Sequence, residues 1–154
     1  MKGLSAESRS MSATSPATEP KKTKLLLIDD DQLTRTTLRA LLRNEGFTAV
    51  REAAEADTGM KMALHFQPDV ICLDLHMPGK SGLELLGELK ACLPDTPVVM
   101  ITSTSDRTTV GACLAGGADG FIIKPFSAEK LVRTIEAVLG KRGTNLRAPL
   151  TGPC

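Results

Sequence analysis

The sequence predicts an α/β fold, a five-stranded parallel sheet with helices on both of its faces. Two kinds of segment alternate along the chain: short runs of apolar residues, and longer segments in which apolar residues recur every three or four positions. Prolines and glycines stand at the boundaries between these segments. Such alternation is typical of strands that run in the same direction and are joined by right-handed crossover helices.

Continuous apolar runs predict the strands, because a strand that is buried on both faces has no polar face to show. The four clear runs are 25–28 (LLLI), 70–73 (VICL), 98–101 (VVMI) and 121–123 (FII), and the segment 47–51 is a weaker candidate. Five strands in this arrangement favour a flavodoxin-like (βα)5 sheet with the strand order 2-1-3-4-5. The ligand site of such a sheet lies at the carboxyl ends of the strands, near the first and third.

Apolar residues that recur every three or four positions predict helices in the segments between the strands and after the last one. The residues with this spacing are Leu38, Leu41 and Leu42 in the first helix and Leu131, Ile135, Val138 and Leu139 in the last. Ser81 and Glu84 fit a capping box at the start of another helix. Gly46 and Gly140 stand where helix C-caps are expected.

The apolar pattern spans residues 23–140, which we expect to form a single domain. The segments 1–22 and 141–154 lack periodic apolar positions. A segment without apolar side chains to bury cannot offset the entropy that ordering costs. We therefore expect a disordered N-terminal tail and a flexible C-terminal tail.

The composition argues against several classes of protein. The 19 basic residues nearly balance the 18 acidic ones, for a net charge of +1, which argues against a nucleic-acid binder that works through a broad basic surface. The four cysteines fit neither a zinc site nor a CxxC motif. No apolar run approaches the ~20 residues needed to span a membrane, and the first residues lack the apolar core of a signal peptide. We expect a cytoplasmic protein without direct contact to membrane or nucleic acid.

Polar side chains directly follow the apolar runs, where the carboxyl ends of parallel strands meet. They are Asp29, Asp30 and Asp31 after the first run, Asp74 after the run 70–73, Thr102 after the run 98–101, and Lys124 after the last run. Carboxylates crowded at one edge of a sheet repel one another and raise one another's pKa. A hard divalent cation relieves this repulsion, and Mg²⁺ prefers oxygen ligands that it shares with phosphate.

The other polar residues at this edge fit a phosphate site. Lys124 stands before Pro125 and can bind a carboxylate in one state and a phosphoryl oxygen in another. Thr102 offers a short hydroxyl that can donate a hydrogen bond to a phosphoryl oxygen. Asp31 either belongs to this acidic set or caps the helix that follows it.

Four segments in this order resemble the receiver domain of two-component response regulators, including the stand-alone chemotaxis type, over about residues 22–140. They are LLLIDDDQLTR, PDVICLDLHMPGKSGLELL, PVVMITS and GADGFIIKPF. The resemblance implies a phosphorylation-dependent signalling switch that catalyses only its own phosphorylation and dephosphorylation. It also implies the following roles: Asp74 as the phosphoacceptor and a metal ligand, Asp29 and Asp30 as the Mg²⁺-binding pair, His76 as a metal ligand through its backbone carbonyl, Thr102 and Phe121 as switch residues, and Lys124 as a catalytic cation.

The resemblance further implies the partners. A sensor histidine kinase or a histidine phosphotransfer protein would donate the phosphoryl group. A downstream effector, and a second copy of the chain if the protein dimerises, would bind the face formed by the fourth helix, the fifth strand and the fifth helix. Because only 15 residues follow Leu139, we expect a stand-alone regulator.

Three other readings compete with the stand-alone regulator. One is a receiver excised from a larger regulator that carries a DNA-binding or enzymatic output. Another is a phosphorelay intermediate that passes the phosphoryl group onward. The third, a flavin-binding protein of the same topology, is disfavoured because the loop after the first run is acidic and would repel a phosphate.

Overall fold

The structure, a computed structural model, describes residues 21–142. Five strands and five helices alternate along this part of the chain: β1 (Lys21–Ile28), α2 (Gln32–Asn44), β2 (Phe47–Ala53), α3 (Ala56–Phe66), β3 (Val70–Leu73), α4 (Gly82–Cys92), β4 (Val98–Thr102), α5 (Arg107–Ala115), β5 (Gly120–Ile123) and α6 (Ala128–Arg142). The strands form one parallel sheet in the order β2-β1-β3-β4-β5. The predicted flavodoxin-like order is therefore confirmed.

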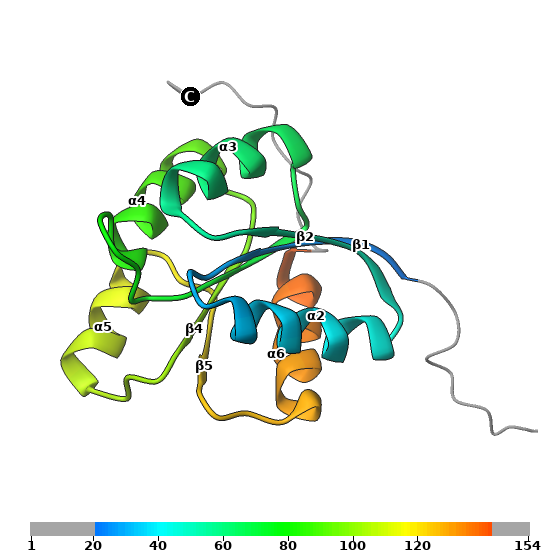
Figure 1. Cartoon of the computed structure of the whole chain (residues 1–154). Coiled ribbons are helices and arrows are strands. Elements are labelled where there is room, and N and C mark those ends of the chain that lie inside the picture. The colour runs from blue at the N-terminus through cyan, green and yellow to red at the C-terminus, as the bar shows by residue number, and fades with distance from the viewer. Residues whose placement is uncertain (1–20, 143–154) are drawn as a thin grey trace, which may run out of the picture.

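Helices cover both faces of the sheet, with α3, α4 and α5 on one side and α2 and α6 on the other (Figure 1). Each side has its own apolar core. In β1, Leu26 and Ile28 belong to the core beneath α3 and α4, and Leu25 and Leu27 belong to the opposite core. All four side chains are fully buried. Successive side chains of a strand point to opposite faces, which explains why the central strands read as continuous apolar runs.

The first strand begins at Lys21, four residues earlier than its apolar run predicts. The backbone N–H of Lys21 donates to the carbonyl of Gly46 at 2.7 Å, and its ammonium lies 4.4 Å from the centre of the Phe47 ring. The ammonium of Lys24 donates to the carbonyl of Phe66 at 3.0 Å. Contacts to β2 and α3 thus extend the strand into a polar segment. The expected tails, 1–22 and 141–154, lie outside the described residues except at positions 21–22 and 141–142.

The helix ends agree with the sequence in part. Ser81 and Glu84 form the predicted capping box at the start of α4, with hydrogen bonds of 3.2 and 3.0 Å. Gly46 follows α2 with a φ of +98°, the conformation that favours glycine after a helix. Gly140 does not end the last helix, since α6 continues to Arg142. Lys and Arg favour helix, so the two residues after Gly140 extend it. Among the described residues no helix is both long and apolar enough to cross a membrane.

Candidate functional site

Three carboxylates meet where β1 and β3 end. Ile28 and Leu73 are paired in the sheet, so Asp29 and Asp74 follow at the same level. Asp29, Asp30 and Asp74 each offer a carboxylate oxygen, and these oxygens all lie within 4.8 Å of one another. The structure thus brings together the three acids that the sequence predicts at this edge.

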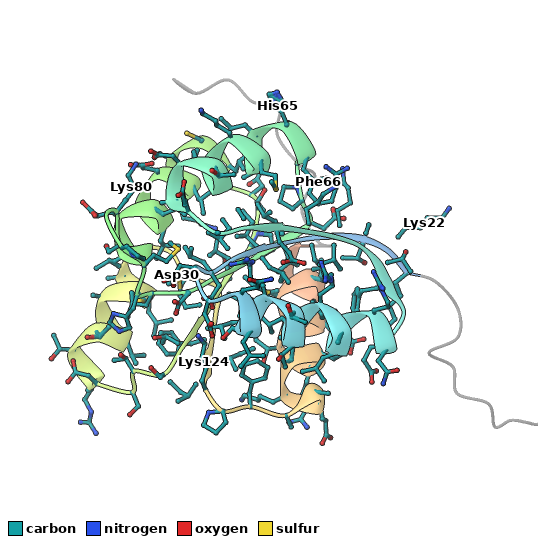
Figure 2. All side chains as sticks on the ribbon, viewed as in Figure 1. Lys22, Asp30, His65, Phe66, Lys80 and Lys124 are labelled. Atoms are coloured by element: carbon teal, nitrogen blue, oxygen red, sulfur yellow. The ribbon has the colours of Figure 1, made fainter. Side chains whose placement is uncertain are left out.

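Lys124 reaches into this carboxylate cluster from the end of β5. Its ammonium lies 3.2 Å from Oδ2 of Asp29 and 3.7 Å from Oδ1 of Asp74. Its backbone N–H donates to the carbonyl of Thr102 at 2.8 Å, and the peptide bond between Lys124 and Pro125 is cis. Figure 2 shows Asp30 and Lys124 at the same end of the sheet. One ammonium thus bridges two carboxylates of neighbouring strands.

The three acids differ in how far they are exposed to solvent. Asp29 and Asp74 are 2% and 6% exposed, whereas Asp30 is open to solvent. Burial, and after it the charge of Asp29, raises the pKa of Asp74 above its ordinary value. The ammonium of Lys124 and the backbone N–H of His76 oppose this rise in pKa. Asp74 is therefore a buried carboxylate whose negative charge needs cationic neighbours.

Hydrogen bonds hold Asp29 at both its backbone and its side chain. Its N–H donates to the carbonyl of Ala53 at 3.1 Å, and its own carbonyl accepts from Nη1 of Arg35 at 2.6 Å. Its Oδ1 accepts from the backbone N–H of Asp31 at 2.8 Å. The orientation of Asp29 is thus determined by its contacts with Ala53 at the end of β2, with Arg35 on α2, and with Asp31 just before α2.

Asp31 caps α2 and does not join the carboxylate cluster. Its side chain accepts from the N–H groups of Leu33 and Thr34, both at 3.3 Å, and from the hydroxyl of Thr34 at 2.6 Å. The bond from the Thr34 hydroxyl is the main reason that the pKa of Asp31 lies below its ordinary value. Of the two interpretations that the sequence left open, the structure supports the helix cap.

A close backbone approach sets the position of the loop after Asp74. The N–H of Gly82, at the start of α4, donates to the carbonyl of Leu75 at 2.8 Å. A Cβ atom at Gly82 would lie 2.1 Å from the carbonyl oxygen of Asp74. Only glycine permits this contact, and the sequence analysis did not identify it. The glycine directly after the N-cap Ser81 was the available signal.

The two predicted switch residues lie on one face of the sheet. Thr102 is fully buried at the end of β4, and its hydroxyl oxygen accepts from the N–H of Thr104 at 3.3 Å. Phe121 in β5 is paired with Met100 and packs, half-buried, against the core beneath α3 and α4. Met100 and Thr102 are two residues apart and so point to the same face. Phe121 and Thr102 thus border the same core.

The ring of His76 lies outside the carboxylate cluster. Its Nε2 lies 2.7 Å from Oγ1 of Thr104, which follows β4. The ring is thereby engaged in a contact that the sequence analysis did not predict, because the two residues are 28 positions apart. The backbone carbonyl of His76 is the group that the sequence analysis expects at the metal.

The donor set fits magnesium. The cluster offers three carboxylates, and no cysteine or histidine of the described chain joins it. Mg²⁺ prefers oxygen ligands and keeps several waters, so two or three carboxylates suffice. A recess of about 460 Å³ opens beside Asp30. Its other lining residues are Ala54, Glu55, Ala56, Asp57, Pro78, Gly79 and Lys80.

Comparison with known proteins agrees with this arrangement. Residues 25–136 match the family model of the response regulator receiver domain. The chain is 33% identical over 116 residues to the cell cycle transcriptional regulator CtrA of Caulobacter vibrioides, covering 75% of this chain and 50% of CtrA. It is 33% identical over 117 residues to the chemotaxis protein CheY of Pseudomonas aeruginosa, covering 75% of this chain and 94% of CheY.

The chain is also similar in structure to a solved chemotaxis protein. The crystal structure of the CheX–CheY–BeF3–Mg²⁺ complex from Borrelia burgdorferi superposes with a TM-score of 0.73 at 26% identity, covering 80% of this chain and 98% of that one. The chain spans about half the length of the transcriptional regulator CtrA and of the response regulator DctR of Bacillus subtilis, and nearly the whole length of the chemotaxis proteins.

Proposed function

This chain belongs to the response regulator receiver domain family, and from that premise we propose that Asp74 accepts a phosphoryl group in a Mg²⁺-dependent reaction. The donor is the phosphohistidine of a sensor histidine kinase or of a histidine phosphotransfer protein. One observation carries the proposal. Asp74 is a buried carboxylate within reach of two further acids and of the Lys124 ammonium.

The chemistry is phosphoryl transfer by positioning. An oxygen of Asp74 forms a bond to phosphorus while the opposite bond, from phosphorus to the donor nitrogen, breaks, and the imidazole keeps that electron pair. Lys124, which now bridges Asp29 and Asp74, moves toward a phosphoryl oxygen and stabilises its charge. Asp29, Asp30, Asp74 and the backbone carbonyl of His76 would hold Mg²⁺, which would supply further positive charge against the phosphoryl group.

Thr102 and Phe121 convert the modification into a change of shape. The hydroxyl of Thr102 moves toward the phosphoryl group, and Phe121 turns into the space that this leaves in the shared core. The change is a shift between two populated states. The face formed by α5, β5 and α6 then reports it to an effector protein or to a second copy of the chain. Leu114 on α5 is 54% exposed and Ile123 on β5 is 37% exposed, which supports a contact surface there.

A stand-alone role in the cytoplasm is part of the proposal. The near-complete coverage of chemotaxis proteins supports it. The half coverage of longer response regulators such as CtrA and DctR favours a second candidate, the receiver portion of a larger regulator. A phosphorelay intermediate would differ from both by passing its phosphoryl group quickly to a histidine phosphotransfer protein. Measuring the rate of that back transfer separates a relay from a regulator that signals by shape.

The central test compares the wild-type protein with Asp74→Asn, using phosphoramidate as the donor because it carries the same phosphorus–nitrogen bond. Asp119→Asn is the matched control, since Asp119 also pairs with a lysine but lies at the other end of the sheet. We expect intact-mass measurement to show one phosphoryl group on the wild type and on Asp119→Asn, and none on Asp74→Asn or in EDTA. Equal modification of Asp74→Asn would refute the proposal.

A further inference from the structure

Arg35 connects the backbone of the carboxylate cluster to the neighbouring strand β2. Its Nη1 donates to the carbonyl of Asp29 at 2.6 Å, and its Nε donates to Oε1 of Glu52 at 3.1 Å. The side chain is only 14% exposed. One guanidinium on α2 thus holds two acceptors, one beside the carboxylates and one on β2.

The carbonyl that Arg35 holds is part of the peptide group that joins Asp29 to Asp30. A peptide group is planar, so fixing the direction of its carbonyl also fixes the direction in which the chain continues to Asp30. Asp29 is held further by Ala53, Asp31 and Lys124. Asp30 is exposed, and no hydrogen bond to its side chain is found in the described chain, so the peptide before it is its main constraint.

Glu52 keeps Arg35 in place. Its Oε1 accepts from Arg35, and its Oε2 accepts from Nη1 of Arg39, one turn further along α2. Glu52 is paired with Leu27 in the sheet and its side chain is 19% exposed. A carboxylate that is held by two arginines on a rigid strand leaves the Arg35 guanidinium little freedom to turn away from Asp29.

We propose that Arg35 is a positioning residue of the metal site: through the Asp29 carbonyl it orients the peptide that presents the Asp30 carboxylate to Mg²⁺, with Glu52 as its anchor. This inference rests on the proposed function, because it assigns a role toward the same metal. Arginine suits the role, since its planar group offers two donors in different directions. A lysine ammonium lacks this fixed fork.

The sign of the effect distinguishes positioning from simple charge. Removing a nearby positive charge should by Coulomb's law strengthen the binding of a cation. Loss of an outer group that orients a metal ligand should instead weaken metal binding, by about 10- to 100-fold. Arg39 provides the matched control, because it carries the same charge and binds the same Glu52, whereas among the hydrogen bonds of the described residues it is Arg35 and not Arg39 that donates to Asp29.

The experiment measures Mg²⁺ dissociation constants by NMR titration for the wild type, Arg35→Gln, Arg35→Lys, Glu52→Gln and Arg39→Gln. We expect Arg35→Gln to bind Mg²⁺ about 10- to 100-fold more weakly, Arg35→Lys and Glu52→Gln to fall between it and the wild type, and Arg39→Gln to bind as the wild type or slightly more tightly. In EDTA, the carbonyl ¹³C signal of Asp29 should shift in Arg35→Gln and not in Arg39→Gln. Phosphorylation of Arg35→Gln should recover at saturating Mg²⁺.

Several outcomes overturn the inference. Mg²⁺ affinity of a folded Arg35→Gln at or above that of the wild type would show that Arg35 acts only as a charge. Equal weakening in Arg39→Gln would show that the effect belongs to the Glu52 contacts in general. If Arg35→Gln does not fold, Arg35→Lys decides, because it keeps the positive charge and only lost positioning can then weaken Mg²⁺ binding. A wild type that is not phosphorylated at Asp74 but binds Mg²⁺ would refute the proposed function alone, and one that does not bind Mg²⁺ would refute both.

Discussion

The two ends of the sheet each hold a lysine paired with aspartate, and the two pairs differ in their surroundings. At the carboxyl end, Lys124 lies between Asp29 and Asp74, at 3.2 and 3.7 Å. At the amino end, Lys90 lies 3.0 Å from Asp119. Both pairs join segments that are far apart in the chain. The difference lies in what else each lysine and each acid can bind.

Backbone groups complete the pair at the amino end. The carboxylate of Asp119 also accepts from the N–H of Val98 at 2.9 Å, and the ammonium of Lys90 also donates to the carbonyl of Thr96 at 3.1 Å. One positive and one negative group are thereby balanced and hydrogen-bonded. Such an arrangement stabilises one structure and offers little to a ligand.

At the carboxyl end one ammonium faces three carboxylates, two of which are buried. The pKa of Asp74 is raised by burial and by the charge of Asp29, so the negative charge there is incompletely balanced. This excess of negative charge is what a divalent cation can relieve. What distinguishes the two ends is thus the number and burial of the acids around the lysine rather than the ion pair itself, and such uncompensated clusters of buried acids are typical of functional sites.

Removing each lysine charge is the strongest test of this contrast. We expect Lys124→Met to slow phosphorylation of Asp74 by about 100- to 1,000-fold, the usual effect of losing a group that stabilises charge on a transferred oxygen. We expect Lys90→Met to keep the rate within about twofold and to lower the free energy of unfolding by about 1–3 kcal/mol, because the carbonyl of the buried Thr96 loses its ammonium donor and the partly buried Asp119 carboxylate loses one of its two donors. Phosphoramidate kinetics and urea unfolding measure the two effects. Similar slowing in both variants would remove the distinction between the two ends.

The close approach at Gly82 gives a second and smaller effect. In Gly82→Ala the new Cβ would meet the Asp74 carbonyl oxygen, so α4 must move away from the loop. We expect a loss of about 1–3 kcal/mol in the free energy of unfolding, as for other overpacked sites. Gly87→Ala in the same helix is the control, since within the described residues nothing beyond its chain neighbours and its own helix backbone lies within 4 Å of the new Cβ. It should gain up to about 1 kcal/mol from helix propensity. Urea unfolding of both variants checks this, and a stability gain in both would contradict the close approach.

The pH dependence of stability is the third and smallest effect. The pKa of Asp74 is raised in the folded state, so the folded protein holds this proton more tightly than the unfolded chain does. Its contribution to stability is therefore full below the ordinary value of 3.8 and is lost as the pH rises through the folded pKa. In EDTA, Asp74→Asn should be more stable than the wild type at pH 7, with an advantage that shrinks toward pH 4. Urea unfolding across this range measures it, and a constant difference would contradict the raised pKa.

The local pattern of apolar residues was sufficient to predict most of the strands and helices. A strand that is buried on both faces requires a continuous apolar run, so the runs at 70–73 and 98–101 coincide with β3 and β4 to within one residue. The start of β1 could not be predicted this way. Lys21 and Lys24 are polar, and their extended conformation depends on the ring of Phe47 and the carbonyl of Phe66.

By itself the sequence determined the order of the strands and the residues that end them, and with these the meeting of Asp29, Asp30, Asp74 and Lys124 at one edge. These features follow from short-range periodicity and from the geometry that any parallel sheet shares. Only the tertiary structure decided how the edge is held. The contacts of Arg35 with Glu52 and of His76 with Thr104 span 17 and 28 positions. Side-chain contacts at such separations depend on how helices pack on the sheet, which no local pattern encodes.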